Sequence, residues 1–164
     1  MHSQSPDEIT FAPLTIDETT VDKLGWSGGP IHIDYVADAV RRSELGETDM
    51  IAGRDKDGRV VCYGGAEYSI EPGSAKLWML IVRPELRGLG IGTKLVEALE
   101  AVASNKVSRV YLNVEKHNQG ARRLYERLGY QVESESTESW YELDDGGERY
   151  LKQAQVFVMA RPTS

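Results

Sequence analysis

The segment that most constrains this chain is a glycine-rich stretch between an apolar run and a helical one. Residues 83–101 read RPELRGLGIGTKLVEALEA and place Gly88, Gly90 and Gly92 at alternate positions. A glycine inside a helix costs about 1 kcal/mol relative to alanine, so three glycines at a helix start indicate a specific backbone requirement. The apolar residues 75–82 therefore predict a strand that enters a helix through a turn without side chains.

The rest of the chain alternates strand-like and helix-like segments. We expect strands at residues 9–14, 49–54, 59–70, 75–82, 108–115, 130–136 and 154–160. Helices are expected at residues 30–45, 91–104 and 118–130, the last with Asn118 as its N-cap and Gly129 where it stops. This order predicts a single α/β domain over residues 1–164, with a mixed, mostly antiparallel sheet of about six or seven strands flanked by about four helices.

Composition excludes several classes of protein. The longest apolar run, residues 77–82, is too short to cross a bilayer. The N-terminus has neither a basic start nor an apolar segment, so we expect no secretory signal. The only cysteine, Cys62, rules out an internal disulfide framework. These features predict a cytoplasmic protein that does not use a membrane.

Charge is concentrated in one segment. The net charge is −7, and residues 133–148 carry seven carboxylates without a lysine or arginine. Binding of nucleic acid through a basic face is therefore not expected. The segment is interpreted as a solvated hairpin, with a cationic partner as the alternative.

The glycine stretch also predicts an anion site. A strand that runs into a helix through glycines exposes free N–H groups at the positive end of the helix dipole, where phosphate binds well. Arg87 and Arg83 would add positive charge. The order of residues does not fit a P-loop, and a dinucleotide fingerprint fits only in part, so nucleotide binding of that kind is a minor alternative. A tight turn without a ligand is the structural alternative.

Two motifs resemble those of one family. Residues 87–92, RGLGIG, resemble the R-x-x-G-x-G/A signature of the GNAT superfamily of N-acetyltransferases. Residues 118–130, NQGARRLYERLGY, resemble the N-x-x-A-x-x-L-Y-x-x-L-G-F/Y helix of the same superfamily. The resemblance is close over residues 48–132, and the strand order fits the family fold over nearly the whole chain.

The resemblance implies acetyl-CoA as cosubstrate. Separately, His2 and His32 form no ligand spacing with His117, so no metal site is expected. The same resemblance implies that backbone groups of Ile81 and Val82 pair with the pantetheine arm, which Asn118 also touches. The pyrophosphate would bind the backbone amides of Arg87, Gly88, Leu89, Gly90, Ile91, Gly92 and Thr93.

The resemblance also implies catalytic roles. Tyr125 becomes the general acid that protonates the CoA sulfur, with simple packing of its ring as the alternative. Ribosomal-protein acetyltransferases of this family carry a glutamate that can act as the base within the pattern L-E-V, where this chain has Asn113. Glu67 and Glu115 are the remaining candidates for the base, and each also fits an ordinary surface carboxylate.

The acceptor is expected between residues 24–35 and residues 139–150. Trp26, Trp140 and Tyr141 would form aromatic walls for an amine, or would pack against the protein instead. The function predicted is direct transfer of acetyl from CoA to a primary amine, either a small molecule or a peptide N-terminus, in a ternary complex. A module that binds or senses acetyl-CoA with little or no catalysis is the alternative, and a homodimer is left open.

Overall fold

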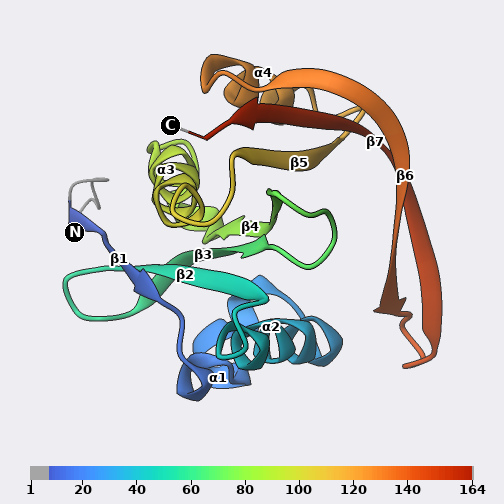
Figure 1. The fold of residues 1–164 in the computed structure, drawn as a ribbon. Coiled ribbons are helices and arrows are strands. Elements are labelled where there is room, and N and C mark those ends of the chain that lie inside the picture. Colours follow the sequence, from blue (N-terminus) through green and yellow to red (C-terminus); the bar gives the residue numbers. More distant parts are fainter. Residues whose placement is uncertain (1–7, 164) are drawn as a thin grey trace.

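The computed structural model describes residues 8–163, which form one seven-stranded mixed sheet with helices on both faces (Figure 1). The strands are β1 (Thr10–Pro13), β2 (Thr48–Arg54), β3 (Val60–Glu67), β4 (Ser74–Val82), β5 (Arg109–Glu115), β6 (Gln131–Leu143) and β7 (Arg149–Pro162). The helices are α1 (Val21–Leu24), α2 (Pro30–Ser43), α3 (Ile91–Ala103) and α4 (Gln119–Arg127), with 3-10 turns η2 (Ile16–Glu18), η3 (Gly25–Ser27) and η4 (Pro84–Leu86). The predicted fold class is confirmed.

The sheet has one parallel contact, and that contact is short. Its strands lie in the order β1-β2-β3-β4-β5-β7-β6, and all neighbours are antiparallel except β4 and β5. This pair is joined by α3, the helix that follows the glycine segment. Pairing covers only Ser74–Leu77 on β4 and Arg109–Leu112 on β5. Beyond these residues the two strands separate.

A bulge in β4 accompanies the separation. Tyr63 on β3 pairs with Ile81, whereas Gly65 pairs with Trp78, so two β4 residues face Gly64 alone. One of those two residues, Met79, has a φ of 54°, a left-handed conformation that is rare for a side chain of this kind. An extra residue bends a strand and raises its twist. The bulge thus turns the second half of β4 away from the path of β5.

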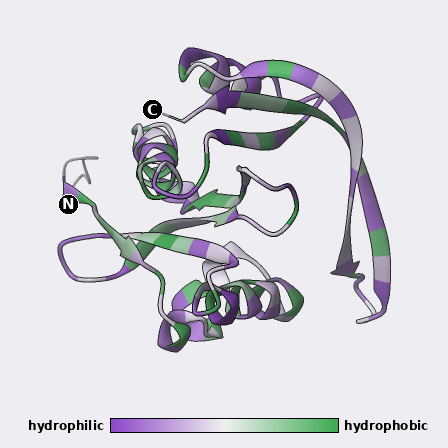
Figure 2. Cartoon of the chain, in the orientation of Figure 1, coloured by the Kyte–Doolittle hydropathy of each residue, from purple (hydrophilic) through white to green (hydrophobic). Residues whose placement is uncertain are grey.

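Two apolar cores cover opposite faces of the sheet. Ile91, Leu95 and Leu99 recur at helical spacing on α3 and are buried against one face, where Tyr125 of α4 also packs. Leu24 of α1 and Val36 of α2 are buried in a second cluster on the other face. Figure 2 shows hydrophobic residues on the central strands and on α3. These cores fix α3 and α4 relative to the split between β4 and β5.

The last two strands are longer than predicted. They form a hairpin that pairs from Gln131↔Ala160 to Leu143↔Arg149, instead of ending near residue 136. Most of β6 is exposed, so its sequence lacks the strong apolar alternation that marks a half-buried strand. Backbone pairing with β7 holds it instead. The hairpin curves around one side of the molecule, and its far end lies toward α2 (Figure 1).

The helix predicted at residues 118–130 begins as expected and ends earlier. The Asn118 side chain accepts a hydrogen bond from the backbone N–H of Ala121, which confirms it as the N-cap. The helix stops at Arg127, and Gly129 follows with a φ of 94°. Among residues 8–163, no helix has the length and apolar character needed to cross a bilayer.

Candidate active site

A cleft of about 270 Å³ lies where β4 and β5 separate. Strand residues from both sides line it, among them Leu80 and Asn113. Asn118, Ala121 and Tyr125 line it from α4 and the loop before that helix. The cleft therefore brings together Asn118, Tyr125 and Glu115, three residues that the sequence analysis had singled out.

The N-terminus of α3 has the features of an anion site. Gly90 is its N-cap, with a φ of 83° and no side chain to cap the first turn. Gly88 is also left-handed, with a φ of 82°. The first N–H groups of a helix lack partners within the helix, so these amides are available to a ligand. Arg87 is exposed beside them, and its Nε donates to the carbonyl of Val82 at 3.3 Å.

Gly92 differs from the other two glycines of the segment. It is the second residue of α3, and no left-handed backbone is recorded for it. A Cβ added there would meet only Val82 Cγ2 at 3.8 Å, an ordinary contact. Neither the backbone nor the packing of the protein explains a glycine here. A ligand that passes close to the helix start does explain it, so the site fits CoA pyrophosphate.

The predicted phosphate and pantetheine residues lie along one path. Leu89, Gly90 and Thr93 follow Arg87 around the start of α3, and Ile91 is buried beneath them. Ile81 and Val82 are half-buried, at the end of β4 that precedes this turn. They pair with β3, and the recorded β5 register ends at Leu77, so the edge of β4 that faces β5 is open beside them.

Tyr125 has the environment of a phenol that keeps its proton. Burial raises the pKa of Tyr125 to about 12. Its ring meets Tyr130 edge-on, with ring centroids 5.8 Å apart. With this pKa the phenol keeps its proton at neutral pH. Tyr125 also lines the cleft between β4 and β5, so it can contact a ligand that occupies this cleft.

A second and larger pocket, of about 910 Å³, opens between α2 and the β6–β7 hairpin. Trp140 and Tyr141 line it from β6, together with Tyr35 of α2 and Trp78 of β4. Trp26 does not line it. The Trp26 indole donates to the carbonyl of Lys23 at 2.9 Å, and its ring packs edge-on against Tyr63.

His32 belongs to the wall of the larger pocket. Its Nε2 lies 2.6 Å from the hydroxyl of Tyr63, and burial lowers the pKa of the imidazole. The Tyr63 hydroxyl in turn donates to Ser27 at 2.8 Å. This chain of hydrogen bonds fixes the N-terminal end of α2 on the sheet.

The two carboxylates proposed as bases lie in different places. Glu67 lines the larger pocket, where both its oxygens accept from the Arg42 guanidinium at 2.8 and 2.7 Å. Burial favours its neutral form, but the interactions with Arg42 and the hydrogen bonds from Ser69 together outweigh this and lower the pKa of Glu67. Glu115 lines the smaller cleft, with its Oε2 3.2 Å from Nε2 of His117.

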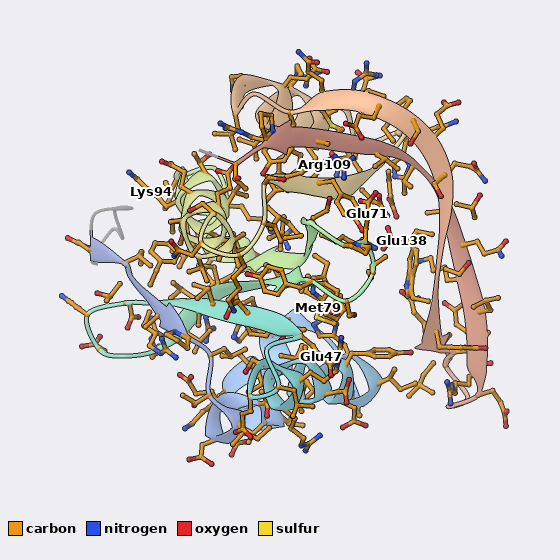
Figure 3. All side chains as sticks on the ribbon, in the orientation of Figure 1. Glu47, Glu71, Met79, Lys94, Arg109 and Glu138 are labelled. Atoms are coloured by element: carbon orange, nitrogen blue, oxygen red, sulfur yellow. The ribbon has the colours of Figure 1, made fainter. Side chains whose placement is uncertain are left out.

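The two cavities meet at four residues. Lys76, Trp78, Met79 and Glu138 line both of them. Figure 3 labels Met79 on β4 and Glu138 on the hairpin strand that faces it. Sequence reasoning missed Glu138 because it lies within the acidic segment with no motif around it. Only the long β6–β7 register brings it to the site.

No group of three or more histidine, cysteine, aspartate or glutamate side chains with the arrangement of a metal site occurs within residues 8–163.

Sequence comparison finds relatives over part of the chain. The "5-NmdU N-acetyltransferase" of Pseudomonas phage PaMx11 is 43% identical over 60 residues, which are 37% of this chain and 41% of the relative. An uncharacterised N-acetyltransferase of Methanocaldococcus jannaschii is 42% identical over 76 residues, which are 45% of this chain and 47% of the relative. The chain thus spans about half the length, or less, of these curated relatives.

Structural comparison extends over nearly the whole chain. The spermidine N-acetyltransferase of Vibrio cholerae, solved with CoA and spermine, has a TM-score of 0.68 at 17% identity and covers 96% of both chains. The PaiA N-acetyltransferase of Thermoplasma acidophilum, solved with coenzyme A, has a TM-score of 0.64 at 16% identity and covers 94% of this chain and 98% of its own. At these identities the likeness establishes the fold.

The sequence pattern of the acetyltransferase (GNAT) family matches residues 22–130. This region contains the split strands, the glycine turn and the helix that carries Tyr125. Because the family pattern covers most of the chain and the fold is that of solved N-acetyltransferases, the chain belongs to the GNAT family.

Proposed function

We propose that the protein is an acetyl-CoA-dependent N-acetyltransferase that passes acetyl directly to a primary amine in a ternary complex. The observation that carries this proposal is the junction of the two cavities. Tyr125 lines the smaller one, whereas the larger one has the aromatic walls that suit an amine. A thioester in the first and an amine in the second would meet at the junction.

Direct transfer is favoured over a covalent enzyme intermediate. The only thiol, Cys62, is fully buried, and burial raises its pKa to about 11. A thiol in that state is a poor nucleophile because the thiolate is the reactive form. We therefore infer that the amine attacks the thioester itself.

Residues at the end of β4, at the start of α3 and on or before α4 have proposed roles in this reaction. The amides at the start of α3, with Arg87, hold the pyrophosphate. Val82, Ile81 and Asn118 position the pantetheine arm along the open edge of β4. Tyr125 donates its proton to the sulfur as the C–S bond breaks, which avoids release of a free thiolate.

The larger pocket supports a small-molecule amine, with a peptide N-terminus as the second acceptor to test. Trp140 and Tyr141 would contact the body of the acceptor, and Tyr35 and Trp78 add further aromatic surface. The comparisons name spermidine for structural neighbours and 5-NmdU for a partial relative. Spermidine is therefore one amine to test, and neither name fixes the acceptor of this chain.

The test is release of CoA thiol from acetyl-CoA in the presence of spermidine, phenethylamine or a short peptide that begins with glycine. We expect release that depends on one of these amines. Tyr125→Phe should lower kcat by about 10²-fold or more, the contribution typical of general acid catalysis, with the affinity for acetyl-CoA nearly unchanged. Bound acetyl-CoA without release for any amine would favour the sensing module instead.

A further inference from the structure

We propose that Glu138 takes the proton from the acceptor amine, with Asn113 and Lys76 as positioning residues that hold its carboxylate at the junction. This inference rests on the proposed acetyl transfer and identifies the base that the sequence left open. An ordinary alkylammonium has a pKa near 10.4, so its deprotonation at pH 7 costs roughly 4–5 kcal/mol. A base at the point where amine and thioester meet removes much of that barrier.

The position of Glu138 distinguishes it from every other carboxylate of the two cavities. Glu67 and Glu142 line only the larger pocket, and Glu115 lines only the smaller cleft. Glu138 lines both. A base must lie within hydrogen-bond reach of the nitrogen as that nitrogen attacks, and the nitrogen crosses this junction.

The oxygens of Glu138 are held loosely enough to receive a ligand. Its Oε1 accepts from Lys76 Nζ at 3.3 Å, and its Oε2 accepts from Asn113 Nδ2, also at 3.3 Å. Charge-assisted hydrogen bonds are usually about 2.7–2.9 Å long, so both contacts are weak. An ammonium can therefore approach either oxygen without breaking a tight ion pair.

The competing carboxylates are already engaged. The Arg42 guanidinium binds both oxygens of Glu67 at 2.8 and 2.7 Å. Glu142 accepts from the Trp140 indole and from the Tyr150 hydroxyl, each at 2.9 Å. Proton transfer to either residue would first require loss of short hydrogen bonds.

Asn113 supplies a second, independent observation. Its Oδ1 is buried without a hydrogen-bond partner among the described residues. An unpaired buried acceptor costs about 1–3 kcal/mol, so the amide does not serve stability at this position. Its Nδ2 instead points the Glu138 carboxylate toward the cleft. Asn113 lies on β5 where the ribosomal-protein acetyltransferases carry a glutamate, and here its amide orients a glutamate from β6.

Glu138 takes one proton from the ammonium and holds it while the freed nitrogen lone pair attacks the thioester carbonyl. The C–N bond forms, the C–S bond breaks, and the sulfur leaves with the bonding electron pair and takes the phenol proton of Tyr125. Glu138 then releases the first proton to water, accepts the second nitrogen proton and releases that proton to water as well, from which Tyr125 regains its own. The net products are the N-acetylated amine, CoA thiol and one proton.

The experiment compares pH profiles of kcat/KM for Glu138→Gln and the wild type, with the amine that the wild type acetylates fastest among spermidine, phenethylamine and the glycine peptide. For the wild type, kcat/KM should not change with pH over the range in which the base is ionised and the amine is protonated. Glu138→Gln should lose about 10²-fold or more near pH 7 and regain about tenfold per pH unit up to the pKa of the amine, because it depends on amine already neutral in solution. CoA affinity should stay unchanged.

Glu135→Gln is the matched control. Glu135 lies on the same strand, paired with Lys116 at 2.6 Å, and lines neither cavity. Its profile should follow that of the wild type. If Glu138→Gln is active and its kcat/KM is as independent of pH as that of the wild type, the proposed role of Glu138 is overturned, whereas the acetyltransferase proposal is not. No transfer by the wild type to any of the three amines would overturn the acetyltransferase proposal, and this inference with it.

Discussion

Gly92→Ala separates a structural reason for the glycine turn from a ligand-binding one. The added Cβ meets only Val82 Cγ2 at 3.8 Å, so the folded protein accommodates it without strain. Alanine is favoured over glycine by up to about 1 kcal/mol in a helix, and we expect about half of that at the second residue of α3. The free energy of unfolding should therefore rise slightly.

Binding of CoA should change in the opposite direction. A methyl group at this position would displace a phosphate from the first-turn amides and weaken one or two charged hydrogen bonds, each worth about 1.5–3 kcal/mol. Partial loss of about 1.4–2.8 kcal/mol corresponds to a 10- to 100-fold higher Kd. Titration calorimetry with CoA and urea unfolding measure the two effects on the same protein.

Gly120→Ala is the control for this prediction. Gly120 is the second residue of α4, and a Cβ there would meet only Asn118 Oδ1 at 3.9 Å. It should gain stability as Gly92→Ala does, with little change in the Kd for CoA. Unchanged CoA affinity in Gly92→Ala would refute the argument that the phosphates pass over this helix start.

Two further predictions concern the acceptor pocket and the Arg42–Glu67 pair. Trp140→Ala should raise the KM for the amine several-fold with little effect on stability. Trp26→Ala removes a ring packed on Tyr63 and should lower the unfolding free energy by about 2–4 kcal/mol. Equal effects of the two variants on KM would contradict this division. Arg42→Met leaves the buried Glu67 carboxylate unpaired and should cost about 2–3 kcal/mol at pH 7, less than for a fully buried pair because Arg42 is a quarter exposed. Folding lowers the pKa of Glu67, so the stability from this pair is present above the ordinary carboxyl pKa of 4.5 and is lost as the pH falls through the folded pKa. The difference in unfolding free energy between wild type and variant, measured by urea unfolding, should therefore shrink in acid. A difference that stays constant with pH would contradict the assignment.

Local patterns in the sequence predicted most of the fold. Residues 91–104 carry apolar side chains at helical spacing, and the observed helix is Ile91–Ala103. Asn118 acts as the N-cap because capping depends only on neighbouring residues. The glycine turn could also be predicted, because the left-handed φ at Gly88 and Gly90 strongly favours glycine at these positions.

The features that the sequence did not predict depend on contacts between distant residues. The bulge at Met79 arises from the register between β3 and β4, and no residue preference marks it. Glu138 reaches Asn113 across 25 positions of sequence, through a hairpin whose exposed strands lack a burial pattern. Trp26 and Trp140 have similar neighbours in sequence, so the sequence does not distinguish them. In the fold, Trp26 packs against the core and Trp140 lines the pocket.

The most direct test of the account is mass spectrometry of the amine after incubation with the protein and acetyl-CoA, with free thiol measured in the same reaction. Direct acetyl transfer predicts N-acetylated amine and thiol in equal amounts, and Tyr125→Phe should lower the formation of both to the same extent. Acetyl-CoA that binds tightly by calorimetry, with no acetylated product from spermidine, phenethylamine or the glycine peptide, would contradict it.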